Sequence, residues 1–207
     1  MDLTKRKTAR PYQQECLDVA IDLLKESIEP VLLNVATGGG KSLLNSFLAE
    51  WGVSQGFDVL CITSFAELVA QNSDELTDQG NHNSIFCATL NQKKYRANIV
   101  VATPQSLWSA IKKGNHPLKD RKFGLMLIDE VHRVNPDDDS TVYMKLINHY
   151  RFNNPELRFC GFSGSCMRGL DDPIYGEGKM FDRLHYSIGF NDLVQENFLL
   201  PPVFGKH

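Results

Sequence analysis

The stretch Val35-Ala36-Thr37-Gly38-Gly39-Gly40-Lys41-Ser42 decides the fold of this chain. An apolar segment at 31–35 precedes it with the composition of a buried strand, and residues 43–51 follow it with apolar side chains at helical spacing. A strand, a glycine loop and a helix together form the context that a phosphate-binding loop requires. A glycine-rich turn that binds nothing is the alternative, but the Lys41–Ser42 pair and both flanking elements favour phosphate binding.

Each residue type in this loop has a separate chemical task. Gly38, Gly39 and Gly40 let backbone N–H groups turn toward a β-phosphate, where any Cβ would intrude. We expect Lys41 to reach the β- and γ-phosphates, and Ser42 to present its hydroxyl to Mg²⁺. The N-terminus of the following helix adds a favourable dipole. The generic pattern begins with glycine, whereas valine occupies position 35 here.

The composition is that of an ordinary soluble globular protein. The 207 residues are 42% hydrophobic and 23% charged, and they suffice for one large domain or two small ones. Because the formal net charge is −3, nucleic-acid binding would have to come from a local patch and not from the charge of the whole chain.

Cysteine usage indicates a reducing compartment. The chain has five cysteines, an odd number: Cys16, Cys61, Cys87, Cys160 and Cys166. They form no Cys-x-x-Cys pair, and most of them lie in apolar runs. This pattern predicts reduced, mostly buried thiols and argues against a disulfide framework and against a zinc site. The N-terminus lacks the apolar core of a signal peptide, and no apolar run approaches the ~20 residues that a bilayer requires. We therefore expect a soluble, cytoplasmic protein.

Strand-like and helix-like segments alternate along the chain. The expected helices lie at about 11–27, 43–51, 67–80, 104–113 and 139–150, and the expected strands at 31–35, 57–63, 84–88, 99–102, 123–128 and 157–162. Residues 166–180 are expected to be irregular, and residues 190–202 to form a short helix and an exit strand or linker. The alternation predicts an α/β fold in which helices cover both faces of a mostly parallel sheet. Polar motifs follow the strands, at the edge where such sheets bind ligands.

An acidic pair follows the apolar strand at 123–128. Asp129 and Glu130 lie about ninety positions after Lys41, a spacing that suits an acidic pair facing a phosphate loop in the same sheet. Asp129 would hold Mg²⁺ through water, and Glu130 would orient and deprotonate the attacking water. His132 could link the γ-phosphate site to neighbouring loops. An isolated Asp-Glu pair is more often a solvated turn, but the preceding strand and the phosphate loop favour a catalytic pair.

Six short motifs occur in the order of one helicase class. They are Arg10-Pro-Tyr-Gln13, Thr37-Gly-Gly-Gly-Lys-Ser42, Glu67-Leu-Val-Ala-Gln71, Thr103-Pro-Gln-Ser-Leu107, Asp129-Glu-Val-His132 and Ser163-Gly-Ser165. Together they resemble the first motor lobe of a superfamily 2 DExH helicase, over the chain from Arg10 to about Pro202. The runs Arg-Pro-Tyr-Gln-Gln-Glu, Glu-Leu-Val-Ala-Gln-Asn and Asn-Pro-Glu-Leu-Arg, with the closing Leu-x-Pro-Pro, are similar to bacterial RadD-type DNA-repair helicases. Motor subunits of restriction enzymes are the nearest alternative relatives.

The resemblance implies a three-layer RecA-like P-loop domain that uses ATP and Mg²⁺. Thr37 joins the glycines in the nucleotide site, and Gln13 would read the adenine edge, because a carboxamide can both donate and accept. Arg10 is a further candidate for that pocket. By motif, the residues that would touch the nucleic-acid backbone are Ser64, Phe65, Thr103 and Gln105, and those that would couple hydrolysis to movement between lobes are Ser163 and Ser165.

Two motifs depart from the family pattern. The chain has Ser64-Phe65-Ala66 where a basic or proline-containing motif is usual, and Ser163-Gly164-Ser165 where Ser/Thr-Ala-Thr is usual. Both hydroxyls of the second motif are retained, while its glycine adds backbone freedom that bears on the strength of coupling. The basic runs at 93–96 and 112–113 would add phosphate contacts or, as is more common for such runs, form a solvated face.

The resemblance also sets the expected domain organisation. Residues 1–30 would form an N-terminal helix with the adenine motif, residues 31–200 the ATP-binding lobe, and residues 201–207 a linker toward a second RecA-like lobe that the 207 residues do not contain. An arginine finger from such a lobe contributes about 10³–10⁵ in rate. We therefore expect this chain alone to bind Mg-nucleotide weakly, to hydrolyse it poorly and to unwind nothing.

The motifs favour the motor lobe of an ATP-dependent DNA helicase or translocase in repair or recombination, with DNA favoured over RNA as partner. The motor of a type I or type III restriction enzyme is one alternative. A non-catalytic nucleotide switch or nucleic-acid-binding module is another. Retention of Lys41, Ser42, Asp129 and Glu130 favours the enzyme, because a decayed site usually loses one of them.

Overall fold

The structure alternates between strands and helices, as the sequence predicts. It is a computed structural model and describes residues 6–168 and 172–201. The elements are α1 (Pro11–Glu26), β1 (Val31–Val35), α2 (Lys41–Ser54), β2 (Val59–Ile62), α3 (Ala66–Asp78), β3 (Asn83–Cys87), β4 (Gln92–Lys93), β5 (Ile99–Ala102), α4 (Pro104–Lys112), β6 (Leu125–Ile128), the 3₁₀ helix η2 (Val131–Arg133), α5 (Val142–Asn153), β7 (Arg158–Ser163), β8 (Met167–Arg168), β9 (Asp172–Pro173), β10 (Tyr186–Ile188) and α6 (Phe190–Gln195).

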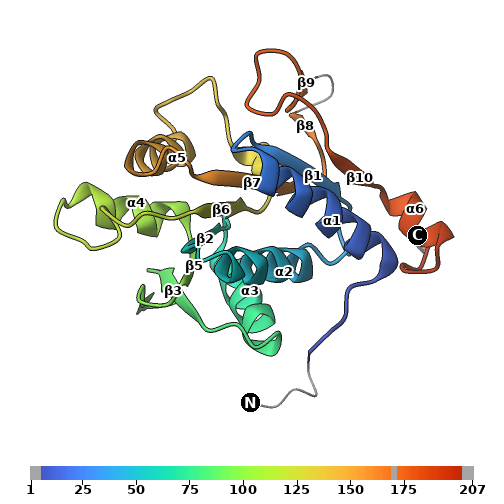
Figure 1. Cartoon of the computed structure of the whole chain (residues 1–207), viewed down its shortest axis with the longest axis horizontal. Coiled ribbons are helices and arrows are strands. Elements are labelled where there is room, and N and C mark those ends of the chain that lie inside the picture. Colours follow the sequence, from blue (N-terminus) through green and yellow to red (C-terminus); the bar gives the residue numbers. More distant parts are fainter. Residues whose placement is uncertain (1–5, 169–171, 202–207) are drawn as a thin grey trace, which may run out of the picture.

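Most strands belong to one sheet with the order β10-β1-β7-β6-β2-β5-β3-β4 (Figure 1). Every neighbouring pair is parallel except β3 and β4, which form an antiparallel hairpin. The register sets Leu33 beside Phe162 and Leu127 beside Cys160. Strand β7 therefore lies between β1, which leads into the P-loop, and β6, which leads into the acidic pair. The predicted α/β fold with a mostly parallel sheet is confirmed.

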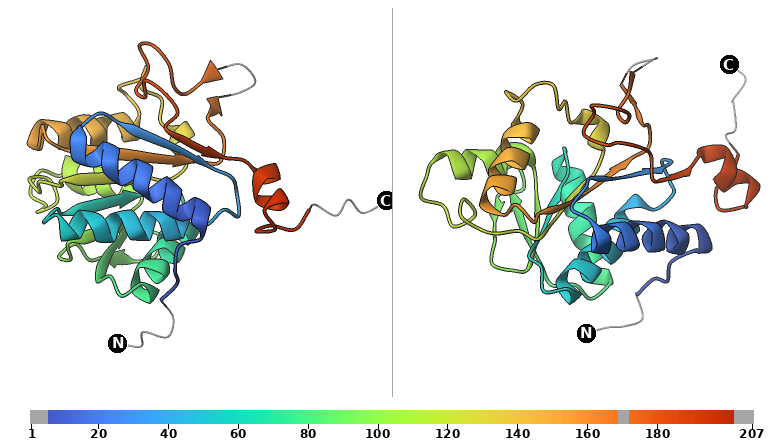
Figure 2. Two further views of the ribbon diagram at one scale, coloured as in Figure 1. Left: turned by 45° about the vertical axis from the view of Figure 1, so that its right-hand side comes forward. Right: turned by 45° about the horizontal axis from the view of Figure 1, so that its top comes forward.

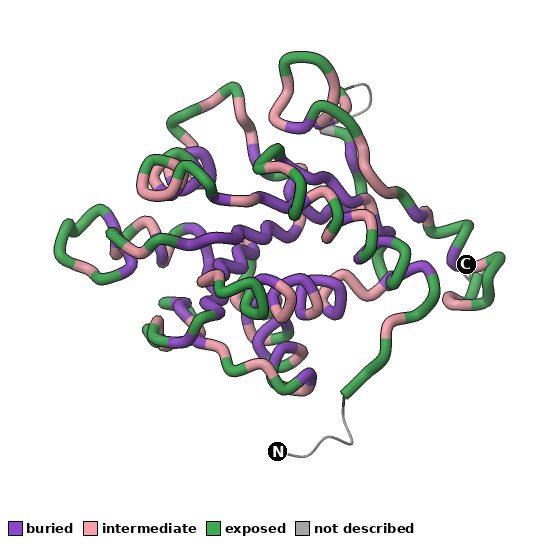
Figure 3. Tube along the Cα trace, in the orientation of Figure 1, coloured by how far each residue is buried: buried purple, intermediate pink, exposed green. Residues whose placement is uncertain are grey.

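Helices cover both faces of the sheet (Figure 2). Helices α1, α2 and α3 pack on one face, in a core that includes Leu33 and Val35 of β1. Helices α4 and α5 pack on the other face, in a core that includes Leu32. Because successive side chains of a strand point to opposite faces, each central strand supplies both cores and is therefore apolar along its whole length. Figure 3 shows the buried residues gathered along these strands and the inner sides of the helices.

The parallel strands bring the sequence motifs to one edge. The P-loop follows β1, Ser64 follows β2, Thr103 follows β5 and Asp129 follows β6, while Ser163 ends β7. In a parallel sheet the carboxyl ends of all strands meet at the same edge, so residues far apart in the sequence become neighbours there.

The sequence interpretation missed four short strands, β4, β8, β9 and β10, of which β8 and β9 lie in the segment that was expected to be irregular. After α6 an exit strand or a linker was expected, and the described residues 196–201 form no strand. After α6 the chain turns back instead, because the N–H groups of Phe198 and Leu199 both donate to the carbonyl of Leu193. Strand β10 has only three residues, and it owes its conformation to parallel pairing with β1, from Leu33↔Tyr186 to Val35↔Ile188.

The prediction of buried thiols is confirmed, since all five cysteines are free and buried. Burial raises the pKa of Cys61 to about 12, and burial together with the nearby Glu15 raises the pKa of Cys16 to about 12. These thiols therefore stay protonated and unreactive at neutral pH. None of the described helices has the length and apolarity required to cross a bilayer.

Candidate active site

The loop between β1 and α2 requires its glycines. Gly38 and Gly40 have φ values of +83° and +78°, in a region that L side chains rarely adopt. A Cβ on Gly39 would lie 2.7 Å from Cγ1 of Val35, and a Cβ on Gly40 would lie 2.4 Å from Nε2 of Gln13. A side chain at either position would therefore fill the turn, whereas glycine leaves its backbone open to a phosphate.

Helix α1 holds this loop from outside. The carbonyl of Gly39 accepts hydrogen bonds from Tyr12 Oη at 3.0 Å and from Gln13 Nε2 at 3.2 Å. Gln13 Oε1 accepts the N–H of Arg10 at 2.9 Å, in a capping box that begins the helix. The Gln13 side chain is buried, and only one N–H and one lone pair of its carboxamide are left for an adenine.

The acidic pair lies where β6 ends. Burial raises the pKa of Asp129 above its ordinary value, and the neighbouring Glu130 carboxylate raises it further, while Lys41 and the Glu130 N–H offset part of this rise. That N–H donates to Asp129 Oδ1 at 3.0 Å. Glu130 has a φ of +52°, an uncommon conformation for a residue other than glycine. Strain of this kind persists only where the surroundings impose it, and it is concentrated at functional sites.

Glu130 joins the P-loop to the end of β7. Its Oε1 lies 3.6 Å from Lys41 Nζ, and its Oε2 lies 3.3 Å from His132 Nδ1. His132 Nδ1 is also 2.9 Å from Ser163 Oγ. Because the Ser163 hydroxyl donates its only hydrogen to the carbonyl of Ser165, its oxygen accepts from His132, and the ring therefore carries a proton on Nδ1. The candidate catalytic and coupling residues thus form one continuous polar chain.

The coupling motif also approaches the P-loop directly. A Cβ on Gly164 would lie 3.3 Å from Lys41 Nζ and 3.4 Å from Thr37 Oγ1. The family's usual alanine at this position would therefore press on the head of the lysine. This departure from the family pattern gives Lys41 room, in addition to adding backbone freedom.

Two oxygen donors suit a magnesium ion. Ser42 supplies a hydroxyl at the start of α2, and Asp129 supplies a carboxylate that is 7% exposed. Mg²⁺ prefers hard oxygen ligands and commonly takes only one or two from the protein, with water and phosphate completing its shell. Gln71 of α3 donates to Ser42 Oγ at 3.2 Å and so orients this hydroxyl. Within residues 6–168 and 172–201, no group of three or more His, Cys, Asp or Glu side chains could hold a metal.

A cavity of about 670 Å³ adjoins the loop. It lies between the segment before α1, the P-loop and α3, and its wall includes the cationic residues Arg6, Lys7 and Arg10 beside Gly38 and Ser42. Arg6 and Lys7 form ion pairs with Glu50 and Glu75 at 2.7 Å and 2.6 Å, and cations beside backbone N–H groups suit a polyanionic nucleotide. Of the expected nucleotide residues, five line this cavity, namely Arg10, Gln13, Gly38, Gly40 and Ser42, while Thr37, Gly39 and Lys41 do not.

The residues expected to contact nucleic acid lie at the ends of neighbouring strands. Two of them are already hydrogen-bonded within the protein, and two are exposed to solvent. The Ser64 hydroxyl lies 2.8 Å from Tyr143 Oη, and the buried Thr103 donates its hydroxyl to Ser106 Oγ at 2.8 Å. Phe65 is 48% exposed and Gln105 is also exposed, so these two are open to a ligand.

Several residues at the site escaped the sequence analysis as functional candidates. Tyr12 and Gln71 lie inside recognised motifs, and motif membership was the only available signal for them. The guanidinium of Arg133 lies 4.8 Å from the centre of the Phe65 ring. Phe198 packs 4.9 Å from the Tyr12 ring, and a Cβ on Gly38 would meet Leu199 at 3.2 Å. Nothing local in the sequence indicates these last contacts.

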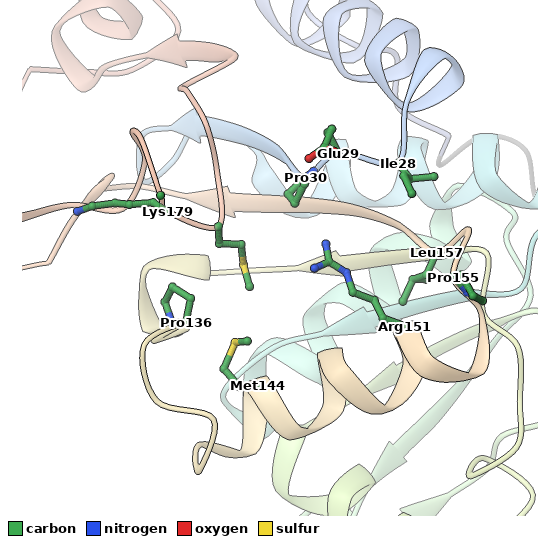
Figure 4. A pocket seen from close by; sticks show the side chains of 11 residues that line it. Ile28, Glu29, Pro30, Pro136, Met144, Arg151, Pro155, Leu157 and Lys179 are labelled. Carbon is green, nitrogen blue, oxygen red and sulfur yellow. The ribbon is translucent and has the colours of Figure 1, made fainter.

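A second large cavity, of about 560 Å³, contains none of these residues. It lies between α5, which supplies Met144 and Arg151, and the segment after β9, which supplies Lys179 (Figure 4). Met180 also lines it. Its size alone does not make it the active site, because the phosphate loop and the acidic pair lie elsewhere.

The chain matches a protein-family model over the segment that contains this site. The family model described as Type III restriction enzyme, res subunit, matches residues 6–164, more than half of the chain, and so includes both the P-loop and the acidic pair. The chain belongs to this family. As a member of the res-subunit family with helicase relatives, it is a helicase-family motor domain, the first RecA-like lobe of the superfamily 2 arrangement.

Curated relatives of this res-family lobe are named as helicases. A candidate mitochondrial ATP-dependent helicase of Schizosaccharomyces pombe, irc3, is 24% identical over 93% of this chain and 31% of its own length. A candidate ATP-dependent RNA helicase of Acanthamoeba polyphaga mimivirus is 29% identical over 72% of this chain and 27% of its own length. The chain thus spans less than a third of the length of each of these relatives.

Solved structures share the fold of the res-family lobe. The UvsW helicase of bacteriophage T4 superposes with a TM-score of 0.60 at 23% identity, over 79% of this chain and 55% of that chain. The Type ISP restriction-modification enzyme LlaGI, solved with a DNA substrate mimic, gives a TM-score of 0.63 at 17% identity, over 92% of this chain and 21% of that chain.

Proposed function

We propose that this res-family lobe binds ATP with Mg²⁺ and hydrolyses it as the first motor lobe of an ATP-dependent DNA helicase or translocase of the DExH type. The observation that carries the proposal is the polar chain from Lys41 through Glu130 to Ser163. It joins the phosphate loop, the acidic pair and the coupling motif, and a lone glycine-rich turn or a solvated acidic pair would form no such connection.

In this proposal the protein positions a water molecule against the γ-phosphate. Glu130 accepts a proton from the water as its oxygen bonds to the γ-phosphorus, and the bond from that phosphorus to the bridging oxygen breaks, so ADP leaves with the bonding electrons. Lys41 and the loop N–H groups stabilise the charge on the transferred group. Ser42 and Asp129 would hold Mg²⁺, which neutralises phosphate charge when it is bound. His132 orients Glu130.

The remaining motif residues have supporting tasks in this proposal. Arg10, Gln13 and Thr37 line the nucleotide side, with residues 1–30 as the adenine-recognition segment and 31–200 as the lobe. Ser163 and Ser165 transmit the state of the γ-phosphate, because Ser163 bonds to the histidine that contacts the catalytic carboxylate. A second RecA-like lobe, reached through residues 201–207, would supply the arginine finger; residues 202–207 of this linker lie outside the described part of the chain. The greater length of the relatives supports such a partner.

The proposed track is DNA, contacted by Ser64, Phe65, Thr103 and Gln105. LlaGI, which shares this fold, was solved with a DNA substrate mimic, and this supports DNA as the substrate. The mimivirus relative is named as an RNA helicase, so RNA is the competing substrate. The RadD-like motif details favour a role in DNA repair, and the five buried, free thiols favour a cytoplasmic location.

A second candidate function is the motor of a restriction enzyme. The match to the res-subunit family model and the fold shared with LlaGI favour it specifically. The chemistry of the lobe is the same in both cases, since each uses ATP hydrolysis to move along DNA. A nuclease or methyltransferase domain in the same polypeptide would support the restriction role.

Steady-state ATP hydrolysis tests the proposed function. The chain is assayed alone, with single-stranded DNA and with single-stranded RNA, beside a Lys41→Ala variant. We expect slow turnover that DNA stimulates more than RNA and that the substitution abolishes. Turnover that Lys41→Ala leaves unchanged would overturn the assignment of the site, and equal or greater stimulation by RNA would overturn the assignment of DNA.

A further inference from the structure

A small, enclosed cavity lies outside the nucleotide site, between α4 and the β3–β4 hairpin. Its volume is about 180 Å³. One wall is formed by Ser106 and Ser109 of α4 and by Lys113, the residue that caps the C-terminus of this helix; their spacings of three and four residues place them on one side of the helix. The opposite wall is Phe86 of β3 with its antiparallel partner Lys93 of β4.

The two walls are fixed to one another. Ser106 Oγ accepts the N–H of Ala88, the first residue after β3, at 2.9 Å. The turn that follows is closed by the Asn91 N–H, which donates to the carbonyl of Ala88 at 2.9 Å, with Asn91 in the left-handed region at φ +51°. These bonds hold the hairpin against α4, so the cavity is formed by the fold and not by loose side chains.

The lining of the cavity is rich in hydrogen-bond donors and has no acid. Lys93 and Lys113 supply two positive charges, and none of the lining residues is Asp or Glu. In the part of the chain that the structure describes, neither lysine has a hydrogen bond or an ion pair from its side chain. Ser109 and Asn115 add a hydroxyl and an amide. Two positive charges of this kind beside one cavity attract an anion, and because both lysine side chains are exposed, this attraction weakens as salt is added.

His116 adds a further donor without adding a charge. Its Nδ1 accepts the N–H of Leu118 at 3.3 Å, so in the neutral ring the proton lies on Nε2. Burial lowers the pKa of His116, which keeps the ring neutral at pH 7. The ring packs edge-on against Phe86 and Tyr95, with centroids 5.1 Å and 5.0 Å away, and these contacts hold it in place.

The cavity is continuous with the proposed nucleic-acid surface. Ser106, which lines it, accepts the hydroxyl hydrogen of Thr103, one of the proposed backbone contacts. From Gln105 to Lys113 the helix rises about 12 Å, at 1.5 Å per residue, which corresponds to three or four nucleotides at about 3.4 Å each along a strand. A strand that passes the start of α4 therefore reaches the cavity within a few nucleotides.

We infer that this cavity is a phosphate-binding subsite for the nucleic-acid strand, in which Lys93 and Lys113 together hold one backbone phosphate. The inference rests on the proposed function, since it extends the nucleic-acid-binding surface of the same motor lobe. It assigns one residue of each basic run, Lys93 and Lys113, to binding. Their neighbours Lys94 and Lys112 are exposed and do not line this cavity.

The test compares two charge-matched pairs of substitutions. Lys93→Gln/Lys113→Gln removes the cations of the cavity, and Lys94→Gln/Lys112→Gln removes the same charge from the adjacent positions. All four side chains are exposed, so each pair is expected to fold. Binding of a fluorescent single-stranded DNA about 12 nucleotides long is measured by anisotropy across a range of salt concentrations.

We expect the cavity pair to weaken binding about tenfold at low salt and to reduce the slope of log K against log salt by about 0.7, the value for one phosphate of a single strand. The neighbouring pair should change both quantities much less. Equal effects of the two pairs would overturn the subsite and leave the proposed function intact. A wild-type chain that binds nucleotide but no DNA or RNA would overturn the proposed function itself, and the subsite with it.

A second measurement separates a phosphate from a base in the cavity. Single uncharged methylphosphonate linkages are placed at each position of the oligonucleotide in turn. At one position the neutral linkage should weaken wild-type binding and have no further effect on the Lys93→Gln/Lys113→Gln variant, as a double-mutant cycle requires of groups in contact. The same series is measured with single abasic nucleotides. If an abasic position, and no neutral linkage, weakens wild-type binding without further effect on the variant, the cavity holds a base, and the phosphate assignment is overturned.

Discussion

At the scale of single residues, Glu130 has the most specific environment in the site. Its strained backbone directs one carboxylate oxygen toward Lys41 and the other toward His132. An entering γ-phosphate competes with Glu130 for the lysine, and this competition would leave the carboxylate free to accept a proton from water. Charge pairing and proton transfer thus use the same group in succession.

The substitution Glu130→Gln tests this role. The amide keeps the size of the side chain but does not accept a proton, so turnover should fall by about 10²–10⁴ while nucleotide binding remains within a few-fold of wild type. Single-turnover hydrolysis and equilibrium binding, measured on the same preparation, separate the two quantities. Wild-type turnover in the variant would remove Glu130 from the mechanism.

Asp129 illustrates how a functional site costs stability. The carboxylate is buried beside a second carboxylate, which is why its pKa is raised. Asp129→Asn should therefore increase the free energy of unfolding without nucleotide by about 1 kcal/mol, or about 2–4 °C in Tm for a domain of this size. The same variant should lose most of the extra stabilisation that Mg²⁺ gives in the presence of ADP. Thermal unfolding with ADP and with Mg-ADP checks both effects, and an unchanged response to Mg²⁺ would contradict the metal assignment.

At the scale of elements, the P-loop combines local conformation with a tertiary contact. Gly40 needs a positive φ, and its missing Cβ also makes room for the Gln13 amide that holds the loop. Gly56, after α2, has a similar φ of +82° but nothing within 4 Å of the position of its Cβ. Substitution of Gly56 therefore tests the effect of backbone conformation alone, whereas substitution of Gly40 also tests the contact with α1.

Gly40→Ala and Gly56→Ala form a matched pair on this basis. Each should lose about 1–2 kcal/mol of stability from the left-handed backbone. Gly40→Ala should lose about 1 kcal/mol more through the displaced Gln13 hydrogen bond. Only Gly40→Ala should weaken nucleotide binding, by tenfold or more. Chemical denaturation and nucleotide titration give the two readouts, and equal nucleotide affinity in the two variants would mean that the close packing at Gly40 is not needed for binding.

The sequence predicted the parts of the site that depend on local pattern. Lys41, Ser42, Asp129 and Glu130 follow apolar strands, and the parallel sheet then brings them to one edge without further information. Strand β10 escaped prediction because Ser187 interrupts its apolar character and only pairing with β1 defines it.

Side-chain orientation was the other limit of the sequence. The Gln13 amide donates to the carbonyl of Gly39, which lies 26 positions away in the sequence. The Ser64 hydroxyl is hydrogen-bonded to Tyr143, which lies 79 positions away. No periodicity or motif spacing encodes such pairings. Motif membership identified the residues, whereas tertiary packing determined which of their polar groups remain available to a ligand.

At the scale of the whole molecule, the lobe places two binding surfaces on one rigid sheet. The nucleotide side involves β1, β6 and β7, and the proposed nucleic-acid side involves the loops after β2 and β5. Arg133 of η2 connects them, because it lies three residues after Glu130 and its guanidinium covers Phe65. A change at the acidic pair therefore has a short structural route to the surface that would contact the strand.

The most direct test of the central claim is nucleotide binding by this chain. Titration with a fluorescent ADP, with and without Mg²⁺, is compared for the wild type, Lys41→Ala and the exposed control Lys122→Ala. We predict Mg²⁺-dependent binding that Lys41→Ala weakens at least tenfold and Lys122→Ala leaves unchanged. Binding that is absent from the wild type at millimolar nucleotide, or that is equal in all three proteins, would contradict the assignment of this loop as the nucleotide site.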